Sequence, residues 1–209
     1  MKTLCLALLL AASAAHALSD SEKETLMTAA VEAYERQDYA TALEKWQTVA
    51  EAGDAEAQNS LGFLYLKGQG VPQDYGKARA WFEKAAAQGH AQAQNNLGAL
   101  YAEGLGVVQD YGQARTWYEK AAAQGYADAA YKLGRLYDDA HDKTKAGQYY
   151  ETARQQWEKA ANAGDADAQY QLGVMCREGL GIPVDAAQAR VWFEKAAAQG
   201  HEAARAALE

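Results

Sequence analysis

The sequence of 209 residues contains almost nothing that would hold it together covalently. It has two cysteines, and Cys5 lies in the apolar stretch at the start of the chain. The rest of the chain therefore carries a single thiol, Cys176, which cannot form an internal disulfide. Side-chain packing alone is expected to stabilise the fold, with Cys176 as a small core residue.

Basic residues are scarce beside acidic ones, with 20 Lys and Arg against 28 Asp and Glu and a formal net charge of −8 at pH 7. An acidic surface repels phosphate groups, so nucleic acid and anionic membranes are not expected partners. Long hydrophobic runs are missing too. Beyond residue 17 no stretch approaches the roughly 20 apolar residues that a membrane-spanning helix needs. We expect no membrane insertion of the mature protein.

Catalytic signatures are absent as well. The sequence has no G-x-S-x-G nucleophile elbow and no H-E-x-x-H metal motif. Two of its histidines, His90 and His201, each follow a glycine that closes a helical pattern, and we expect both to be exposed turn residues. The sequence predicts no enzyme, with no catalytic residue, no metal site and no cofactor.

Residues 1–17 have the three parts of a signal peptide. Lys2 supplies the positive charge, residues 4–12 form the apolar segment, and Ala15-His16-Ala17 is a cleavage site with small residues at both ends. We expect cleavage after Ala17 and a periplasmic or secreted protein.

What the sequence has in abundance is internal repetition. A Leu-Gly-x-Leu-Tyr motif begins at Leu61, Leu97 and Leu133 and recurs at Leu172 with Met and Cys in its last two places, at spacings of 36, 36 and 39 residues. An aromatic-Glu-Lys-Ala-Ala motif follows in phase, and each copy closes on a glycine. The aromatic residues of this second motif are Phe82, Tyr118, Trp157 and Phe193.

Each copy contains two helical patterns joined by a short loop. Apolar residues recur at helical spacing in both halves, and Gly62 leaves room for the neighbouring helix to approach closely. A Gly-x-Gly-Val loop ends the first helix, and Asp74 is placed to cap the second. A single pair cannot bury both of its apolar stripes, so stacked pairs are expected to share a continuous core.

These motifs resemble the Sel-one-like repeat (SLR) family, a relative of the tetratricopeptide repeats. The resemblance covers about residues 55–205 and implies an all-α, right-handed superhelical solenoid of about five antiparallel helix pairs, acting as an adaptor. One branch of the family, described as binding or hydrolysing β-lactams, has a cysteine pair in each repeat, and this chain lacks those pairs. The predicted organisation is a signal peptide (1–17), a divergent tetratricopeptide-like pair (18–54), repeats 1 to 4 (55–90, 91–126, 127–165 and 166–201) and a C-terminal cap (202–209).

Repeat 3 departs from the pattern. Residues 138–144 replace the Gly-x-Gly-Val loop, and the repeat carries three extra residues. One interpretation is a loop that contacts a partner or binds a cation through Asp138, Asp139, His141 and Asp142. The other is a solvated loop followed by a longer second helix through Tyr149, Tyr150 and Ala153.

The first helices are expected to line the concave side of the solenoid, where a protein partner would bind. Aromatic and arginine side chains are the usual anchors of such interfaces. An exported scaffold for envelope assembly, regulation or host contact is the leading hypothesis; a hydrolase acting on the cell wall or on β-lactams and a self-assembling envelope component are the alternatives. The predicted partner-binding residues are Asn59, Phe63, Asn95, Tyr131, Arg135 and Tyr170.

Overall fold

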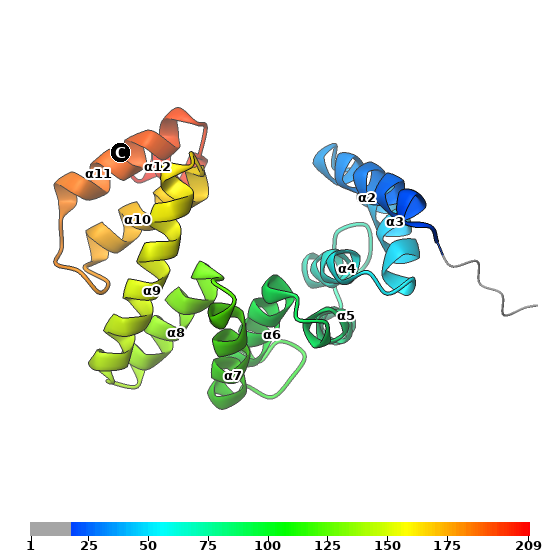
Figure 1. Ribbon diagram of the computed structural model, residues 1–209, viewed down its shortest axis with the longest axis horizontal. Helices are drawn as coiled ribbons and strands as arrows, with labels where there is room; N and C mark the ends of the chain where they lie inside the picture. The colour runs from blue at the N-terminus through cyan, green and yellow to red at the C-terminus, as the bar shows by residue number, and fades with distance from the viewer. Residues whose placement is uncertain (1–17) are drawn as a thin grey trace, which may run out of the picture. The chain divides into compact units, whose positions relative to one another are not determined.

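The computed structural model describes residues 18–209 (Figure 1). Every regular element in this range is an α-helix, which confirms the predicted fold class. Within the same range, no helix is both long and apolar enough to cross a membrane. The predicted signal peptide, residues 1–17, lies outside the described residues.

The chain divides after His90 into two compact units. In each unit, consecutive helices form pairs, and each pair packs against the next. The first unit holds two pairs, α2 (Asp20–Glu35) with α3 (Tyr39–Glu51) and α4 (Ala55–Lys67) with α5 (Tyr75–Ala87). The second unit holds α6 (Ala91–Glu103) with α7 (Tyr111–Ala123), α8 (Ala127–Asp139) with α9 (Lys143–Asn162), α10 (Ala166–Glu178) with α11 (Ala186–Ala198), and the short α12 (Glu202–Ala206).

A glycine on the first helix of each repeat meets an aromatic ring on the second. A Cβ atom added to Gly62 would lie 2.5 Å from the ring of Phe82, and one added to Gly134 would lie 2.5 Å from the ring of Tyr150. Any larger side chain would push the helices apart, so glycine sets their close approach. This confirms the role predicted for Gly62. The other two pairs are Gly98 with Tyr118 and Gly173 with Phe193.

Two kinds of connection join the helices within a pair. In repeats 1 and 4, a left-handed glycine ends the first helix and a six-residue loop leads to an aspartate N-cap, as from Gly68 to Asp74. The α2–α3 and α8–α9 connections are tight turns in which Gln37 (φ 62°) and His141 (φ 61°) take the left-handed conformation. Repeat 3 thus has the kind of turn found in the divergent N-terminal pair.

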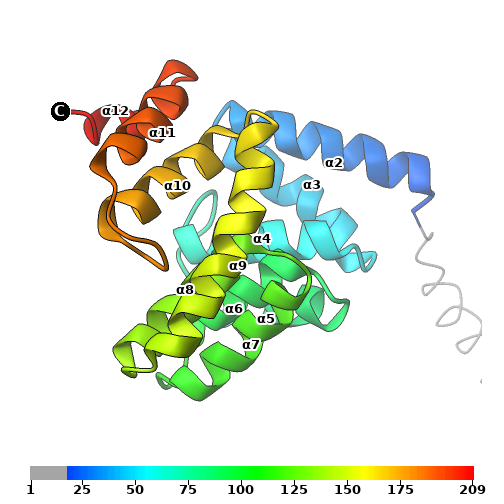
Figure 2. The same cartoon turned by 60° about the vertical axis from the view of Figure 1, so that its left-hand side comes forward.

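The extra length of repeat 3 lies in its second helix, which confirms the interpretation of a longer helix through Tyr149, Tyr150 and Ala153. Asp138 and Asp139 end α8, Asp142 caps α9, and the turn is four residues shorter than the loops of the other repeats. Helix α9 has 20 residues where α5, α7 and α11 have 13, and it is visibly the longest helix of its unit (Figure 2).

The longer helix also changes which aromatic residue of repeat 3 corresponds to Phe82, a position that the motif alignment gave to Trp157. Measured from the N-cap, Tyr150 holds the position of Phe82, and Trp157 comes seven residues later. Because 7 residues make almost two helical turns, about 20° short of a full match, both aromatic side chains remain on the face that packs in the core. Tyr150 is 2% exposed and Trp157 6% exposed.

In three repeats, a buried glutamine on the first helix pairs with an exposed glutamine that follows the second helix. The side-chain amide of Gln88 donates to Gln58 (2.9 Å), that of Gln124 to Gln94 (2.8 Å), and that of Gln199 to Gln169 (2.9 Å). Repeat 3 has alanine at both corresponding positions, Ala130 and Ala163, so the pair is lost together and no amide is left without its partner. Repeat 3 therefore differs from the other repeats in its turn, its second helix and its polar pairs.

Candidate binding surface

The two predicted asparagines lie inside the protein. Asn59 and Asn95 are each 4% exposed, so the expectation that they present an open surface to a partner is wrong for their positions. Each directly follows a buried alanine and a buried glutamine, on α4 or on α6, and lies on the side of its helix that faces the core.

The remaining predicted residues keep some surface. Phe63, on α4, is partly buried with the ammonium of Lys67 over its ring at 5.6 Å. On α8, Arg135 is exposed and donates to the hydroxyl of Tyr131 (3.3 Å). The Tyr131 ring packs against Trp157, with ring centroids 5.5 Å apart. Tyr131 therefore packs at the edge of the core, and its ring is not free to insert into a partner.

Tyr170, on α10, stacks on His201, with ring centroids 4.7 Å apart and 20° between the planes. His201 is not the exposed turn residue that the sequence predicts. Its Nδ1 accepts from the backbone N–H of Ala204 (3.1 Å), and its Nε2 lies 3.1 Å from Asp167. His90 makes the same kind of contact, with its Nε2 2.9 Å from Glu56. Both imidazoles are more than four-fifths buried.

A second surface emerges from the way loops cover the preceding repeat. In the first unit, a Cβ on Gly70 would lie 2.6 Å from the carbonyl oxygen of Tyr39, the first residue of α3. In the second unit, a Cβ on Gly181 would lie 2.7 Å from Cβ of Tyr150 on α9. Each Gly-x-Gly loop therefore packs directly on the second helix of the repeat before it. Tyr39 and Tyr150 both stand seven residues before a tryptophan, Trp46 and Trp157.

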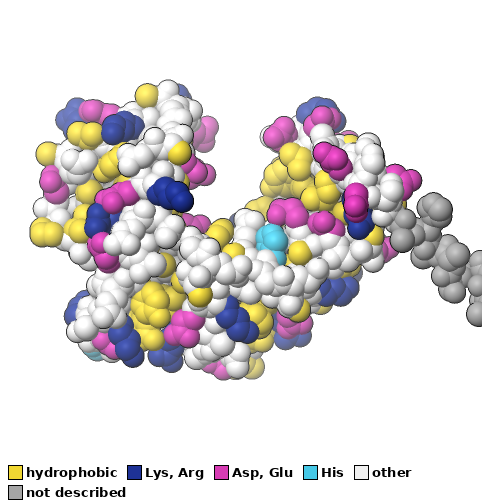
Figure 3. Space-filling view, in the orientation of Figure 1, with side chains coloured by type: hydrophobic (Ala, Val, Ile, Leu, Met, Phe, Trp, Pro, Cys, Tyr) yellow, Lys and Arg dark blue, Asp and Glu magenta, His cyan; other side chains and the backbone are white. Residues whose placement is uncertain are grey.

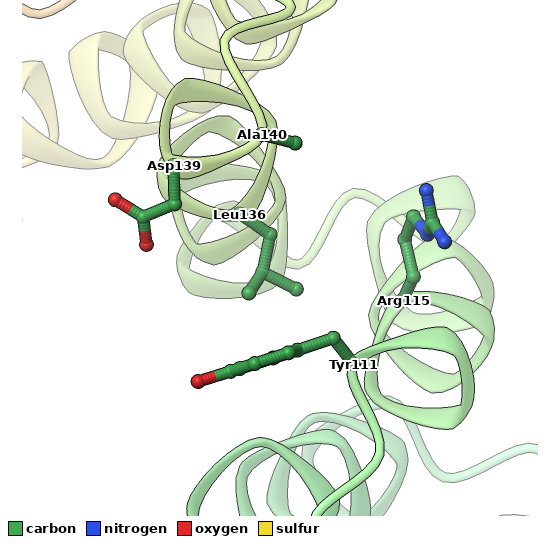
Figure 4. A pocket seen from close by; sticks show the side chains of 5 residues that line it. All are labelled: Tyr111, Arg115, Leu136, Asp139 and Ala140. Atoms are coloured by element: carbon green, nitrogen blue, oxygen red, sulfur yellow. The ribbon is translucent and has the colours of Figure 1, made fainter.

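Tyr111 holds this same position on α7, seven residues before Tyr118, but the loop that would cover it is missing from repeat 3. As a result Tyr111 is 55% exposed, whereas Tyr39 is partly buried and Tyr150 is buried. A cavity of about 270 Å³ stands at this place (Figure 4). Leu136 points toward the Tyr111 ring, and Arg115 and Asp139 lie to either side. The lining residues are Tyr111, Arg115, Leu136, Asp139 and Ala140.

Charged and aromatic side chains continue beside this cavity. Tyr137 stacks on Tyr149 with ring centroids 5.5 Å apart and planes 4° from parallel. Arg115 and Lys145 lie over the Tyr137 ring at 5.6 and 5.0 Å. Burial raises the pKa of Tyr149, and the charge of Glu119 raises it further. Figure 3 shows hydrophobic side chains grouped where α7, α8 and α9 reach the surface, with acidic and basic side chains next to them.

The acidic groups of the α8–α9 turn are already engaged. Asp138 accepts from Lys143 (2.9 Å) and from the Tyr150 hydroxyl (3.1 Å), and Asp142 caps α9. Burial raises the pKa of Asp138, but these hydrogen bonds outweigh it and the pKa is lowered. No three acidic, histidine or cysteine side chains within residues 18–209 are placed to hold a metal ion.

Cys176 lies in the core, 6% exposed. Burial raises the pKa of its thiol, and the charges of Asp185 and Glu158 raise it further. A buried thiol with a raised pKa is a poor nucleophile, which agrees with its prediction as a core residue.

Sequence reasoning missed the cavity at Tyr111 because it looked for binding residues on first helices. The sequence nevertheless contains a signal, because repeat 3 lacks the Gly-x-Gly loop. The residue that this loop covers in other repeats is therefore left exposed. The contacts of His90 and His201 were missed because each partner lies on the first helix of the same repeat, 34 residues earlier in the chain.

Comparison with known proteins places the chain among repeat proteins. The family model of the Sel1 repeat matches residues 55–90, 91–126, 127–165 and 166–201. A search of the curated proteins found no match.

Solved structures show the same fold. The crystal structure of c5321, a protective antigen of uropathogenic Escherichia coli with an SLR fold, is 32% identical (TM-score 0.61). The match covers 90% of this chain and 40% of that chain, so this chain spans less than half of the antigen. A Sel1 repeat protein from Oxalobacter formigenes is 30% identical (TM-score 0.57), with 88% of this chain and 86% of that chain covered.

A further likeness concerns the fold alone. The immunity protein Pa5087 from Pseudomonas aeruginosa is 24% identical with a TM-score of 0.57, over 84% of this chain and 67% of that chain. Four matched repeats, their glycine–aromatic helix pairs and the solved relatives agree, and the chain belongs to the Sel1 repeat family, whose members are in general scaffolds for protein–protein interaction.

Proposed function

We propose that this chain is an exported scaffold that binds a protein partner through the cavity around Tyr111. Export is supported by the signal-peptide pattern of residues 1–17. A role in envelope assembly, regulation or contact with a host protein fits such a location. Binding is supported by the family, whose repeats mediate protein–protein interaction.

The observation that carries the proposal is the exposure of Tyr111 where the other repeats have a covering loop. The Gly-x-Gly loops of repeats 1 and 4 cover the equivalent tyrosines of the preceding helix pairs. Repeat 3 has no such loop, and Tyr111 is 55% exposed beside Leu136. Tyrosine and arginine are enriched among the residues that dominate binding energy. An exposed Tyr111 next to Arg115 and an apolar side chain is therefore a suitable anchor for a partner.

The missing loop also indicates what the partner would bring. In repeats 1 and 4, the segment on the tyrosine is a glycine backbone followed by Val71 or Ile182. A glycine is required there because a Cβ would lie within 2.6–2.7 Å of its neighbours. The partner is accordingly proposed to insert a short loop with a glycine and a branched apolar residue, in the place of the loop that repeat 3 lacks.

The test is an affinity capture from extract and medium of the source cells, with the protein as bait and mass spectrometry as readout. The informative variant is Tyr111→Ala with Arg115→Ala, which removes two exposed side chains and leaves the core intact. Truncating an anchor residue typically costs about 2 kcal/mol or more, roughly a 30-fold loss of affinity. The matched control is Tyr75→Ala, at the same position of α5.

A partner that is held by the native protein and by Tyr75→Ala, but lost by the Tyr111 and Arg115 variant, supports the proposal. A partner that all three baits hold equally contradicts the proposed surface. Circular dichroism of each bait establishes that the helices remain folded.

A further inference from the structure

Equivalent positions in the repeats form a side-chain pair whose chemistry changes in repeat 3. The residue after the closing glycine contacts the second residue of the first helix. The pair is His90 with Glu56 (2.9 Å) in repeat 1 and His201 with Asp167 (3.1 Å) in repeat 4. In repeat 3 the same two positions hold Asp165 and Asp128. A pair with a hydrogen-bond donor has become a pair of carboxylates.

Histidine performs two tasks at this position, and aspartate can perform only one. The Nδ1 of His201 accepts from the backbone N–H of Ala204 at the start of α12, so its proton is on Nε2, which lies 3.1 Å from Asp167. Asp165 likewise accepts from the backbone N–H of Ala168 (2.8 Å) and caps α10. An ionised carboxylate has no proton to donate, so Asp165 gives Asp128 no hydrogen bond.

The electrostatic consequence is visible in the two carboxylates at the same repeat position. The hydrogen bond from His90 lowers the pKa of Glu56. For Asp128 the direction is reversed: burial raises its pKa, and the charges of Asp167 and Asp165 raise it further, against Lys132 and a hydrogen bond from Trp157. Asp128 is therefore a half-buried carboxylate whose charge is not fully compensated within the repeat.

A cavity of about 390 Å³ opens beside Asp128. Its walls combine three aromatic rings with three carboxylates, and Ala127, Ala160 and Ala168 leave it roomy. Tyr170 is fixed by its stacking on His201, and burial raises the pKa of Tyr126 to about 12, so its hydroxyl stays neutral. The aromatic and acidic lining residues are Tyr126, Trp157, Tyr170, Asp128, Asp165 and Asp167.

This combination of walls selects an organic cation. No three acidic side chains within residues 18–209 converge closely enough for a metal ion, so a ligand that spans the cavity is required. A lysine side chain packs its methylene stem against aromatic rings and carries its charge at the tip. Its ammonium is a compact charge that can turn a donor toward any one of these carboxylates, whereas the planar guanidinium of arginine needs a carboxylate that it can meet side-on.

We propose that the cavity between α8, α9 and α10 binds a lysine side chain of the protein partner, whose ammonium takes the place that the histidine N–H occupies in repeats 1 and 4. The inference rests on the proposed function in that the lysine belongs to a protein. It concerns a different cavity from the one at Tyr111, and a peptide probe tests it without knowledge of the partner.

The test is a titration of the purified, isotope-labelled protein with tetralysine, followed by NMR at the indole N–H of Trp157. The expected result is a saturable shift of this signal, with no shift from tetralysine acetylated at every side chain, and weaker binding of tetra-arginine. Asp128→Asn is expected to weaken binding about tenfold, the loss of one charge-assisted hydrogen bond. Glu56→Gln makes the same change of charge at the equivalent position of repeat 1 and is expected to have no effect.

A second variant separates loss of the site from loss of the fold. Asp165→His restores the pair of repeats 1 and 4, since histidine both caps a helix and places its other ring nitrogen beside the carboxylate, as His201 does. It is expected to keep cooperative unfolding and to abolish the Trp157 shift. Equal losses in Asp128→Asn and Glu56→Gln would show only general attraction of a cation to an acidic protein and would overturn the proposal. So would an unchanged shift in Asp165→His. The partner capture with the Tyr111 and Arg115 variant tests the proposed function. The tetralysine titration does not depend on its outcome.

Discussion

At the scale of single residues, Asp128 and Glu56 show how neighbours decide what a carboxylate contributes. They occupy the same repeat position, but Glu56 contacts an imidazole, whereas burial and the nearby charges of Asp167 and Asp165 act against the ionised form of Asp128. The first arrangement favours the folded state once the carboxyl group is ionised. The second disfavours it, because burial and like charges penalise the ionised form. An empty binding site for a cation is expected to lower the stability of the unliganded protein in this way.

Asp128→Asn is therefore expected to stabilise the unliganded protein at neutral pH by about 0.5–2 kcal/mol, the usual range for improving an unfavourable surface charge. The pKa of Asp128 is raised in the folded state above the value of about 3.9 for an unfolded chain. The penalty is thus fully present above the folded pKa and disappears as the pH falls below the unfolded value. Chemical denaturation of the native protein and the variant across this pH range measures it. A stabilisation that persists unchanged at pH 3 would contradict the assignment.

The sequence predicts single residues well where the reason is local. The roles of Gly62 in helix approach and Cys176 in the core follow from motif position and hold in the structure. The contacts of His90 and His201 with acidic residues were not predicted, because a turn pattern gives no information about a partner on another helix. The burial of Asn59 and Asn95 was missed for a related reason, since both follow a buried glutamine and extend the core stripe by one residue.

At the scale of elements, α9 combines two registers in one helix. Its N-terminal half places Tyr150 against Gly134, and its C-terminal half places Trp157 seven residues before the closing Gly164. An insertion of 7 residues keeps both faces aligned to within about 20°, whereas 5 residues would rotate one half by about 140° at 100° per residue. The sequence pattern looks continuous for this reason, so the sequence alone left both a divergent loop and a longer second helix open.

Deletion of residues 150–156 from α9 is expected to preserve the fold, because Trp157 then takes the slot of Tyr150 and the helix regains the 13 residues of its counterparts. Deletion of residues 152–156 is expected to abolish cooperative unfolding, since it turns Trp157 away from the core. Thermal unfolding followed by circular dichroism compares the two. Cooperative unfolding of both variants at similar temperatures would contradict the two-register description.

At the scale of the whole molecule, repeats 1 and 4 have internal contacts that stabilise the fold, whereas repeat 3 adjoins the proposed binding sites. Repeats 1 and 4 pair their own glutamines and carboxylates through amide contacts and histidines, and the loop of each covers a tyrosine of the preceding helix pair. Repeat 3 lacks all three devices, and both cavities proposed as binding sites adjoin it. The family and the all-helical fold follow from repetition in the sequence. The binding surface follows from what one repeat omits, which becomes evident only when its counterparts show what the omitted segment covers.

The most direct test of the central claim, that repeat 3 binds a partner where it lacks a loop, is a loop graft. Residues 140–141 are replaced by the six residues that repeat 2 has at 104–109, so that the protein covers Tyr111 with its own chain. The affinity of the captured partner is then measured by calorimetry for the native and grafted proteins, once both are shown to unfold cooperatively. The account predicts that the graft weakens binding at least about 30-fold, the loss expected when an anchor is blocked. An unchanged affinity in a grafted protein whose Tyr111 is covered would contradict it.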